Sequence, residues 1–191
     1  MNRISFIHAV ATKLFSEKGY KGASLQGIAQ EVGIQKASLY HYIPSKEELL
    51  CEIFLSVVER LQTQFIKIRK ECLHPLERIR RFIGCYLSFV VNDRSAFQVF
   101  LTEKRELTPQ HRKKVDVVCD LLNSLMREAI LQAKDEGLLS PDVKEDLATL
   151  FIFGACNWVV EWFSPQGRYS VEDIAKYYVS IFLKGLKDGG E

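Results

Sequence analysis

Residues 35–46 carry many side chains that can bind an anionic partner and form hydrogen bonds with it. The stretch reads QKASLYHYIPSK. It supplies an amide in Gln35, an ammonium in Lys36 and an imidazole in His41, which suit phosphate oxygens and nucleic-acid base edges. Ala37 is small enough to allow close approach to a base edge. A solvated surface does not need two tyrosines here, and a buried surface would not tolerate so many polar groups. The stretch is therefore predicted to face a nucleic acid.

The rest of the chain lacks the residue spacings that catalytic and metal sites require. The 5 cysteines and 4 histidines are dispersed, without a CxxC or HExxH motif. We therefore predict that the protein is not an enzyme and holds no metal or cofactor. The odd number of cysteines and the lack of a secretory leader predict reduced thiols and a cytoplasmic location. The longest apolar run, residues 147–160, is too short to span a bilayer, so no membrane partner is expected.

The distribution of charge also favours an anionic partner for the N-terminal part. Residues 1–50 contain 6 Lys/Arg and 4 Asp/Glu, and the remaining residues contain 20 of each, so the formal net charge of +2 lies in the first quarter. Two charges alone do not establish nucleic-acid binding.

Three short helices are predicted to position the polar stretch. Apolar residues on one helical face indicate a first helix that ends at Gly19. Ser24 is a suitable N-cap for a second helix, which ends at Gly33. A third helix covers residues 35–42 and ends before Pro44. The glycine between the second and third helices permits a tight turn with positive φ, as in the helix-turn-helix arrangement. The third helix would then enter the major groove of DNA; the alternative is an ordinary three-helix core.

The remaining sequence is also helical and lacks the alternating pattern of β-strands. Capping boxes at residues 45–48 and 170–173 begin the fourth and the last helix. Capping residues, glycines and prolines define six helices in this part, at about residues 45–71, 75–91, 95–105, 109–137, 140–163 and 170–189. We therefore predict an all-α protein. It has an N-terminal three-helix helix-turn-helix DNA-binding domain, residues 1–46, and a six-helix C-terminal bundle for ligand binding and dimerisation, residues 47–191.

Residues 24–50, SLQGIAQEVGIQKASLYHYIPSKEELL, closely resemble the N-terminal signature of TetR-family transcriptional regulators. The chain departs from the usual pattern at Val32 in place of alanine, at Ala37 in place of glycine or proline, and at Ile43 in place of phenylalanine. The matching positions are Ile28, Ala29, Gly33, Leu39, Tyr40, Tyr42 and residues 46–49.

The resemblance implies roles for the polar residues of this segment. Tyr42 and Lys46 would hold phosphates, whereas residues 35–38, Tyr40 and His41 would approach bases. A helix N-terminus favours an anion, so a second helix that begins at Ser24 offers a further phosphate contact. The predicted DNA-binding residues are Ser24, Gln35, Lys36, Ala37, Ser38, Tyr40, His41, Tyr42 and Lys46.

The last two predicted helices have the composition of a subunit interface. The helix over residues 140–163 is apolar nearly all round and needs neighbours on every side, and the last helix carries a second apolar stripe. Pairing both helices with their two-fold copies would give a homodimer that reads a palindromic operator with half-sites about 34–36 Å apart. The alternative is a monomer in which these helices are only core.

The middle helices are predicted to bind a hydrophobic effector. Aromatic and aliphatic residues there could surround an apolar cavity, and Asn157 and Glu161 would form a buried polar pair that either bonds within the core or orients a ligand. The predicted ligand-binding residues are Phe82, Tyr86, Phe89, Phe97, Phe100, Leu101, Leu122, Met126, Asn157, Trp158, Glu161 and Trp162.

A second resemblance concerns the identity of the effector. Residues 157–175, NWVVEWFSPQGRYSVEDIA, resemble the C-terminal motif of TetR-type regulators that respond to acyl-CoA thioesters of fatty-acid or steroid degradation. This resemblance implies a repressor that an acyl-CoA releases from its operator. Two alternatives remain open: a repressor of the same fold that answers to multidrug-type or aromatic compounds, and a helical adaptor without DNA binding.

Overall fold

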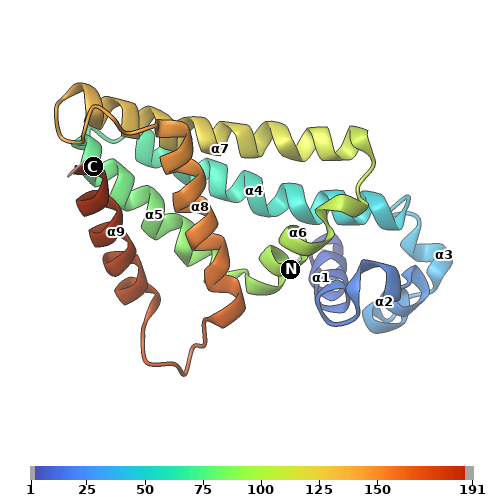
Figure 1. The fold of residues 1–191 in the computed structure, drawn as a ribbon. Coiled ribbons are helices and arrows are strands. Elements are labelled where there is room, and N and C mark those ends of the chain that lie inside the picture. Colours follow the sequence, from blue (N-terminus) through green and yellow to red (C-terminus); the bar gives the residue numbers. More distant parts are fainter. Residues whose placement is uncertain (1–2, 188–191) are drawn as a thin grey trace. The chain divides into compact units, whose positions relative to one another are not determined.

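The predicted all-α architecture is confirmed. The structure, a computed structural model, describes residues 3–187, and this part of the chain contains no β-strand. None of its helices is long and apolar enough to cross a membrane. The elements, labelled in Figure 1, are α1 (Arg3–Gly22), α2 (Leu25–Val32), α3 (Lys36–Leu39), α4 (Lys46–Lys70), α5 (Pro75–Asn92), α6 (Arg94–Glu103), the 3-10 helix η1 (Lys104–Glu106), α7 (Pro109–Asp135), α8 (Glu145–Trp162) and α9 (Val171–Lys187).

The chain packs into two compact units. Unit 1 runs to Glu59 and takes in Asp93–Val118, and unit 2 consists of Arg60–Asn92 and the chain from Cys119 onward. Helices α4 and α7 therefore contribute to both units. Unit 1 also contains α6, which packs against α1, although α6 was predicted to belong to the C-terminal bundle. The predicted boundary between the DNA-binding and C-terminal domains, after residue 46, thus does not coincide with the boundaries of the two compact units.

Local hydrogen bonds at α2 agree with the predicted helix signals. The Ser24 hydroxyl caps the helix and accepts the backbone N–H of Gly27 at 3.0 Å. At the other end, Gly33 adopts a left-handed conformation with φ 76° and ψ 36°. Its N–H bonds to Gln30, and the next N–H returns to Ala29, which satisfies the last carbonyls of the helix and turns the chain towards α3.

Replacing Gly33 by alanine is expected to lower the free energy of unfolding by about 1 kcal/mol, because a Cβ disfavours the left-handed conformation. Gly84 is the matched control, since it lies inside α5 and has open space where an alanine Cβ would project. Gly84→Ala should raise stability by about 0.5–1 kcal/mol. Urea unfolding of both variants measures the difference, and equal effects of the same sign would contradict this account.

The third and eighth helices are shorter than predicted. α3 ends at Leu39 rather than Tyr42, and Tyr40–Tyr42 form a turn in which the N–H of Tyr42 bonds to the Leu39 carbonyl three residues back. α8 begins at Glu145 rather than at Ser140. The backbone N–H of Ser140 donates instead to the carbonyl of Leu186, at 2.8 Å, so residues 138–144 are drawn into a connection with the end of α9. The predicted end of the last helix near residue 189 lies outside the described residues.

One of the two predicted capping boxes is complete. At α9, the Ser170 hydroxyl accepts the N–H of Asp173 at 3.1 Å, and the Asp173 carboxylate accepts the N–H of Ser170 at 3.1 Å. At α4, the Ser45 hydroxyl accepts the N–H of Glu48 at 3.0 Å, but the Glu48 carboxylate pairs with His111 instead. A long-range partner has replaced the local one there.

Candidate nucleic-acid interface and ligand-binding region

The structure presents the predicted DNA-facing segment at the surface of unit 1. Leu39 and Ile43 are fully buried and anchor the segment. Ser38 is half-buried, and the ammonium of Lys36 lies 5.8 Å from the ring centre of Tyr40. The exposed residues are Gln35, Lys36, Ala37, Tyr40, His41 and Tyr42. Two buried aliphatic side chains thus hold a surface of amide, ammonium, imidazole and phenol groups, although α3 itself is only four residues long.

The phosphate contact of Lys46 stays a prediction, and two of the three N–H groups of its ammonium have internal partners. Its ammonium donates to the carbonyls of Tyr20 and Ala23, both at 2.9 Å, and lies 4.3 Å from the ring centre of Tyr20. Burial lowers the pKa of Lys46, and nearby Glu106 partly opposes that shift. Lys46 therefore ties the start of α4 to the end of α1, where free carbonyls favour a cation. Sequence spacing could not reveal this, because both carbonyls lie more than 20 residues earlier.

Five of the predicted ligand-binding residues line the interior of unit 2. Phe82, Tyr86, Leu122 and Met126 are buried, and the Tyr86 hydroxyl donates to Oδ1 of half-buried Asn157 at 2.7 Å. Complete burial raises the pKa of the Tyr86 phenol, so it remains a hydrogen-bond donor. These residues belong to an aromatic core in which Phe82 stacks on Phe65 at 4.4 Å and Tyr86 packs on Phe153 at 4.7 Å.

Three other predicted ligand-binding residues belong to unit 1. Phe97 is buried, Phe100 packs edge-on against Phe54 with ring centres 5.3 Å apart, and Leu101 is exposed. All three lie on α6, whose main neighbour is α1. These three residues therefore lie apart from the buried predicted residues of unit 2, and their contact with a ligand stays a prediction. Phe89, in unit 2, is half-buried, and the Arg60 guanidinium lies 5.8 Å from its ring.

The last three predicted ligand-binding residues lie at the surface. Trp158 is 65% exposed and Trp162 is 44% exposed. Glu161 is also exposed and so does not form a buried polar pair with Asn157. These side chains point away from the core because the opposite side of α8, which includes Cys156, Val159 and Val160, already fills it.

An aromatic cleft lies where α8 ends and α9 begins. It has a volume of about 760 Å³ and is lined by Trp162, Arg168, Tyr169, Asp173, Ile174, Tyr177 and Tyr178. The guanidinium of Arg168 lies 5.3 Å from the ring centre of Tyr169. Of these residues only Trp162 was predicted to bind the ligand, whereas Ile174, Tyr177 and Tyr178 belong to the apolar stripe predicted for the dimer interface. The other residues fall within or beside the motif at residues 157–175, which was the available signal. A flat apolar group with an anionic substituent would suit rings beside a guanidinium.

The five cysteines are free thiols that differ in burial. No group of three or more metal-ligating side chains occurs in the described part of the chain. Cys51 and Cys156 are buried, Cys85 and Cys119 are half-buried, and Cys72 is exposed. Burial raises the pKa of the Cys85 thiol to about 11, although nearby Arg81 opposes the shift.

Alkylation at pH 8 should therefore modify Cys72 well before Cys85. A thiol pKa two units above the ordinary value leaves about 100-fold less thiolate, the reactive form. Raising the pH to 10 should speed the reaction at Cys85, because the thiolate fraction grows until the pH passes the raised pKa. Peptide mapping after timed iodoacetamide treatment measures both rates, and equal rates at pH 8 would contradict the prediction.

Comparisons with known proteins identify the family. Residues 7–53 match the model described as "Bacterial regulatory proteins, tetR family", and residues 72–186 match "Tetracyclin repressor-like, C-terminal domain". The HTH-type transcriptional repressor KstR2 of Mycobacterium tuberculosis (strain ATCC 25618 / H37Rv) is 26% identical over 183 residues, which cover 95% of this chain and 91% of KstR2.

Solved structures agree with this assignment. The TetR-family regulator PfmR from Thermus thermophilus matches with a TM-score of 0.87 and 32% identity, covering 95% of this chain and 98% of that chain. AibR, solved in complex with isovaleryl coenzyme A and operator DNA, matches with a TM-score of 0.86 and 29% identity over 94% of this chain and 97% of that chain. These relatives are regulators, which confirms that the chain is not an enzyme. The chain belongs to the TetR family of bacterial transcriptional regulators.

Proposed function

We propose that the protein is a homodimeric repressor that binds a palindromic operator and that an acyl-CoA thioester releases it. The proposed DNA contacts are made by the exposed polar segment, residues 35–42, and by the N-terminus of α2 at Ser24. Lys46 is left out because its contacts are internal. The proposal is supported by the match of residues 7–53 to the family's N-terminal model and by the exposure of the polar segment.

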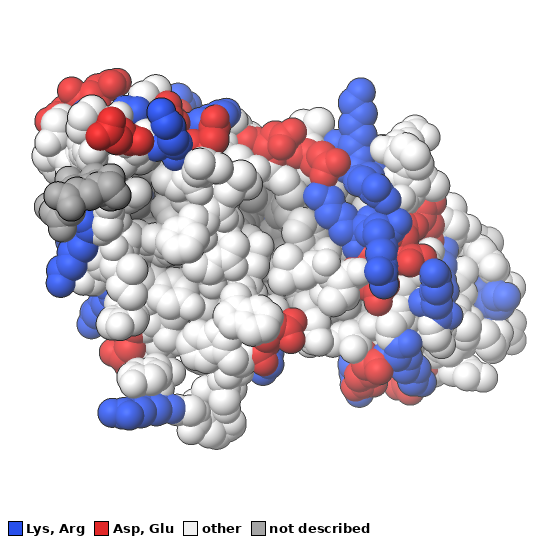
Figure 2. Space-filling model, in the orientation of Figure 1, with Lys and Arg blue, Asp and Glu red and all other residues white. Residues whose placement is uncertain are grey.

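An unpartnered apolar surface on unit 2 supports dimerisation through α8 and α9. Phe151, Trp158 and Tyr177 are 64%, 65% and 67% exposed, unusually high for large apolar and aromatic side chains. Figure 2 shows a broad area over α8 without charged residues. We call this surface the apolar face; its residues are Leu147, Leu150, Phe151, Trp158, Trp162, Tyr177 and Ile181. α8 presents Leu147, Leu150, Phe151, Trp158 and Trp162 on one side at helical spacing, and α9 presents Tyr177 and Ile181 four residues apart. Each helix therefore carries an exposed apolar stripe that a two-fold copy can cover.

The aromatic cleft supports a large amphipathic effector. An acyl-CoA carries a purine ring, phosphates and an apolar chain, and the cleft offers aromatic rings together with Arg168. The cleft shares Trp162 and Tyr177 with the apolar face, so the proposed ligand would bind at the border of the proposed subunit interface. AibR, 29% identical to this chain, was solved with isovaleryl coenzyme A, and this is the observation that carries the effector class. Ligand bound in unit 2 would favour one position of α4, and the resulting shift of the recognition segments would lower operator affinity.

Two measurements test the proposal. Duplexes selected from a random pool should bind with a strong salt dependence, and the absence of such binding would leave the adaptor alternative. Thermal-shift titration should then compare coenzyme A, a graded acyl-CoA series and planar aromatic compounds. We expect stabilisation that depends on acyl length, together with release of the selected duplex. If the melting temperature does not change across the acyl-CoA series but rises with planar aromatic compounds, an aromatic effector is favoured.

A further inference from the structure

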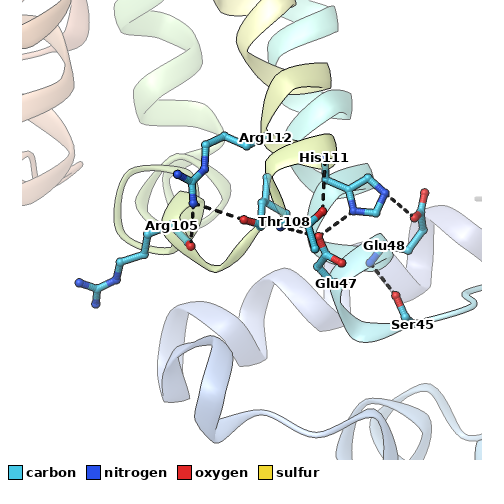
Figure 3. Close-up of polar contacts among 8 residues, drawn as sticks. Ser45, Glu47, Glu48, Arg105, Thr108, His111 and Arg112 are labelled. Atoms are coloured by element: carbon cyan, nitrogen blue, oxygen red, sulfur yellow. Dashed lines mark hydrogen bonds and ion pairs between the residues drawn. The ribbon is translucent and has the colours of Figure 1, made fainter.

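A single imidazole ring joins the first turns of α4 and α7. Nδ1 of His111 lies 2.7 Å from Oε1 of Glu47, and Nε2 lies 2.9 Å from Oε2 of Glu48. Figure 3 shows the ring between the two carboxylates. Glu47 also accepts the backbone N–H of Thr108, at 2.8 Å, just before α7 begins. We call Glu47, Glu48 and His111 the α4–α7 joint.

The ring can donate a hydrogen bond to both carboxylates only when both of its nitrogens are protonated. An ionised carboxylate can only accept, and an imidazole has two N–H donors only when it is protonated at both nitrogens. A neutral ring must present a lone pair to one of the two carboxylates. Glu47 itself stays ionised near neutral pH: burial raises its pKa, but hydrogen bonds from Thr108 and His111 outweigh this effect and lower it.

The position of the joint connects it to DNA binding. The DNA-facing segment, residues 35–42, ends four residues before α4 begins at Lys46. The Lys46 ammonium in turn donates to two carbonyls at the end of α1. Helices α4 and α7 both continue from unit 1 into unit 2, across Glu59–Arg60 and Val118–Cys119. The joint thus holds together the unit 1 ends of two helices that run through both units.

We propose that His111 is a positioning residue for operator binding: the doubly protonated ring holds α4 in the operator-binding position, and loss of one ring proton weakens operator affinity. The inference rests on the DNA-binding part of the proposed function and is independent of the effector.

The groups around the joint define the controls. Arg112 donates to two carbonyls of the preceding segment, at 2.9 and 3.3 Å, rather than to the joint. Cys51 lies near both glutamates of the joint and near Lys114, and burial keeps it a neutral thiol by raising its pKa. His8 pairs with a single carboxylate, that of Glu52, at 2.9 Å. His8→Gln is therefore the matched control for the loss of a His–Glu pair.

The experiment measures operator affinity at fixed salt between pH 5.5 and 8.5, with a duplex selected at pH 6. Wild-type protein should lose about tenfold in affinity as the pH rises, the size expected for one hydrogen bond to a charged group. His111→Gln should bind about tenfold more weakly at pH 6 and show little pH dependence, since an amide cannot reproduce a doubly donating ring. Glu48→Gln should keep its affinity at high pH, because its amide can donate to the lone pair of a neutral ring. Far-UV circular dichroism at each pH checks that every variant is folded.

The variants separate this role from others. His8→Gln should retain the wild-type pH dependence. A wild-type affinity that is constant with pH would overturn the inference, as would Glu48→Gln losing affinity in parallel with wild type. If His41→Gln abolished the pH dependence and His111→Gln retained it, the titrating group would lie at the DNA surface and the inference would also be overturned. If the protein binds the operator as expected but does not respond to acyl-CoA, the proposed effector is wrong, and the inference about His111 is unaffected.

Discussion

Replacing Leu150 by glutamate is expected to make the protein monomeric and to lower its operator affinity by about 100-fold or more, because two linked half-sites bind far more tightly than one. Leu150 lies in the middle of the apolar face and is 62% exposed. A carboxylate placed there would be buried without a partner when two copies of α8 and α9 pack together. Since the side chain makes few contacts within its own chain, the fold of the protomer should survive.

Val117 provides the matched control for this experiment. It is an apolar residue on α7 with the same exposure of 62%, but it lies outside the apolar face. Val117→Glu should therefore leave the mass in solution and the operator affinity unchanged. Sedimentation equilibrium gives the mass of each variant, and a mobility shift assay gives its affinity. A Leu150→Glu variant that remains dimeric would place the subunit interface elsewhere.

Removing the amide of Gln35 should lower affinity for the selected operator by about 100-fold, because a lost base contact worth about 1–2 kcal/mol occurs once in each half-site. Gln35 is exposed directly before α3 and makes no side-chain capping bond. The expected signature of a base contact is a relaxed preference at one position of each half-site, whereas loss of a phosphate contact would weaken all sequences equally.

The control for Gln35→Ala is Gln110→Ala. Gln110 is also an exposed glutamine of unit 1, but it belongs to α7 and not to the DNA-facing segment. Competition binding with duplexes changed at single positions measures both affinity and preference. If the two glutamine variants behave alike, residue 35 does not read the operator.

The sequence by itself was sufficient for features that depend on neighbours within a few residues. The cap at Ser24, the left-handed turn at Gly33 and the box at residues 170–173 all form as predicted. Leu39 and Ile43, which are four residues apart, are both buried beneath the exposed polar segment, as the spacing of one helical turn allows. Each of these features is set by local backbone geometry or by the period of one helix, so the pattern carries the information.

Only the tertiary structure decided which distant groups these residues meet. Spacing did not predict that the Lys46 ammonium donates to two carbonyls at the end of α1. The second half of the box at Ser45 is missing because Glu48 pairs with His111, and Phe97 lies in unit 1 because α6 packs on α1. A charged side chain takes the partner that packing brings within about 3 Å in partly buried surroundings, where such contacts are stronger than in water. That partner can lie more than 60 residues away in the chain, as for Glu47 and Thr108, beyond what periodicity or capping rules can predict.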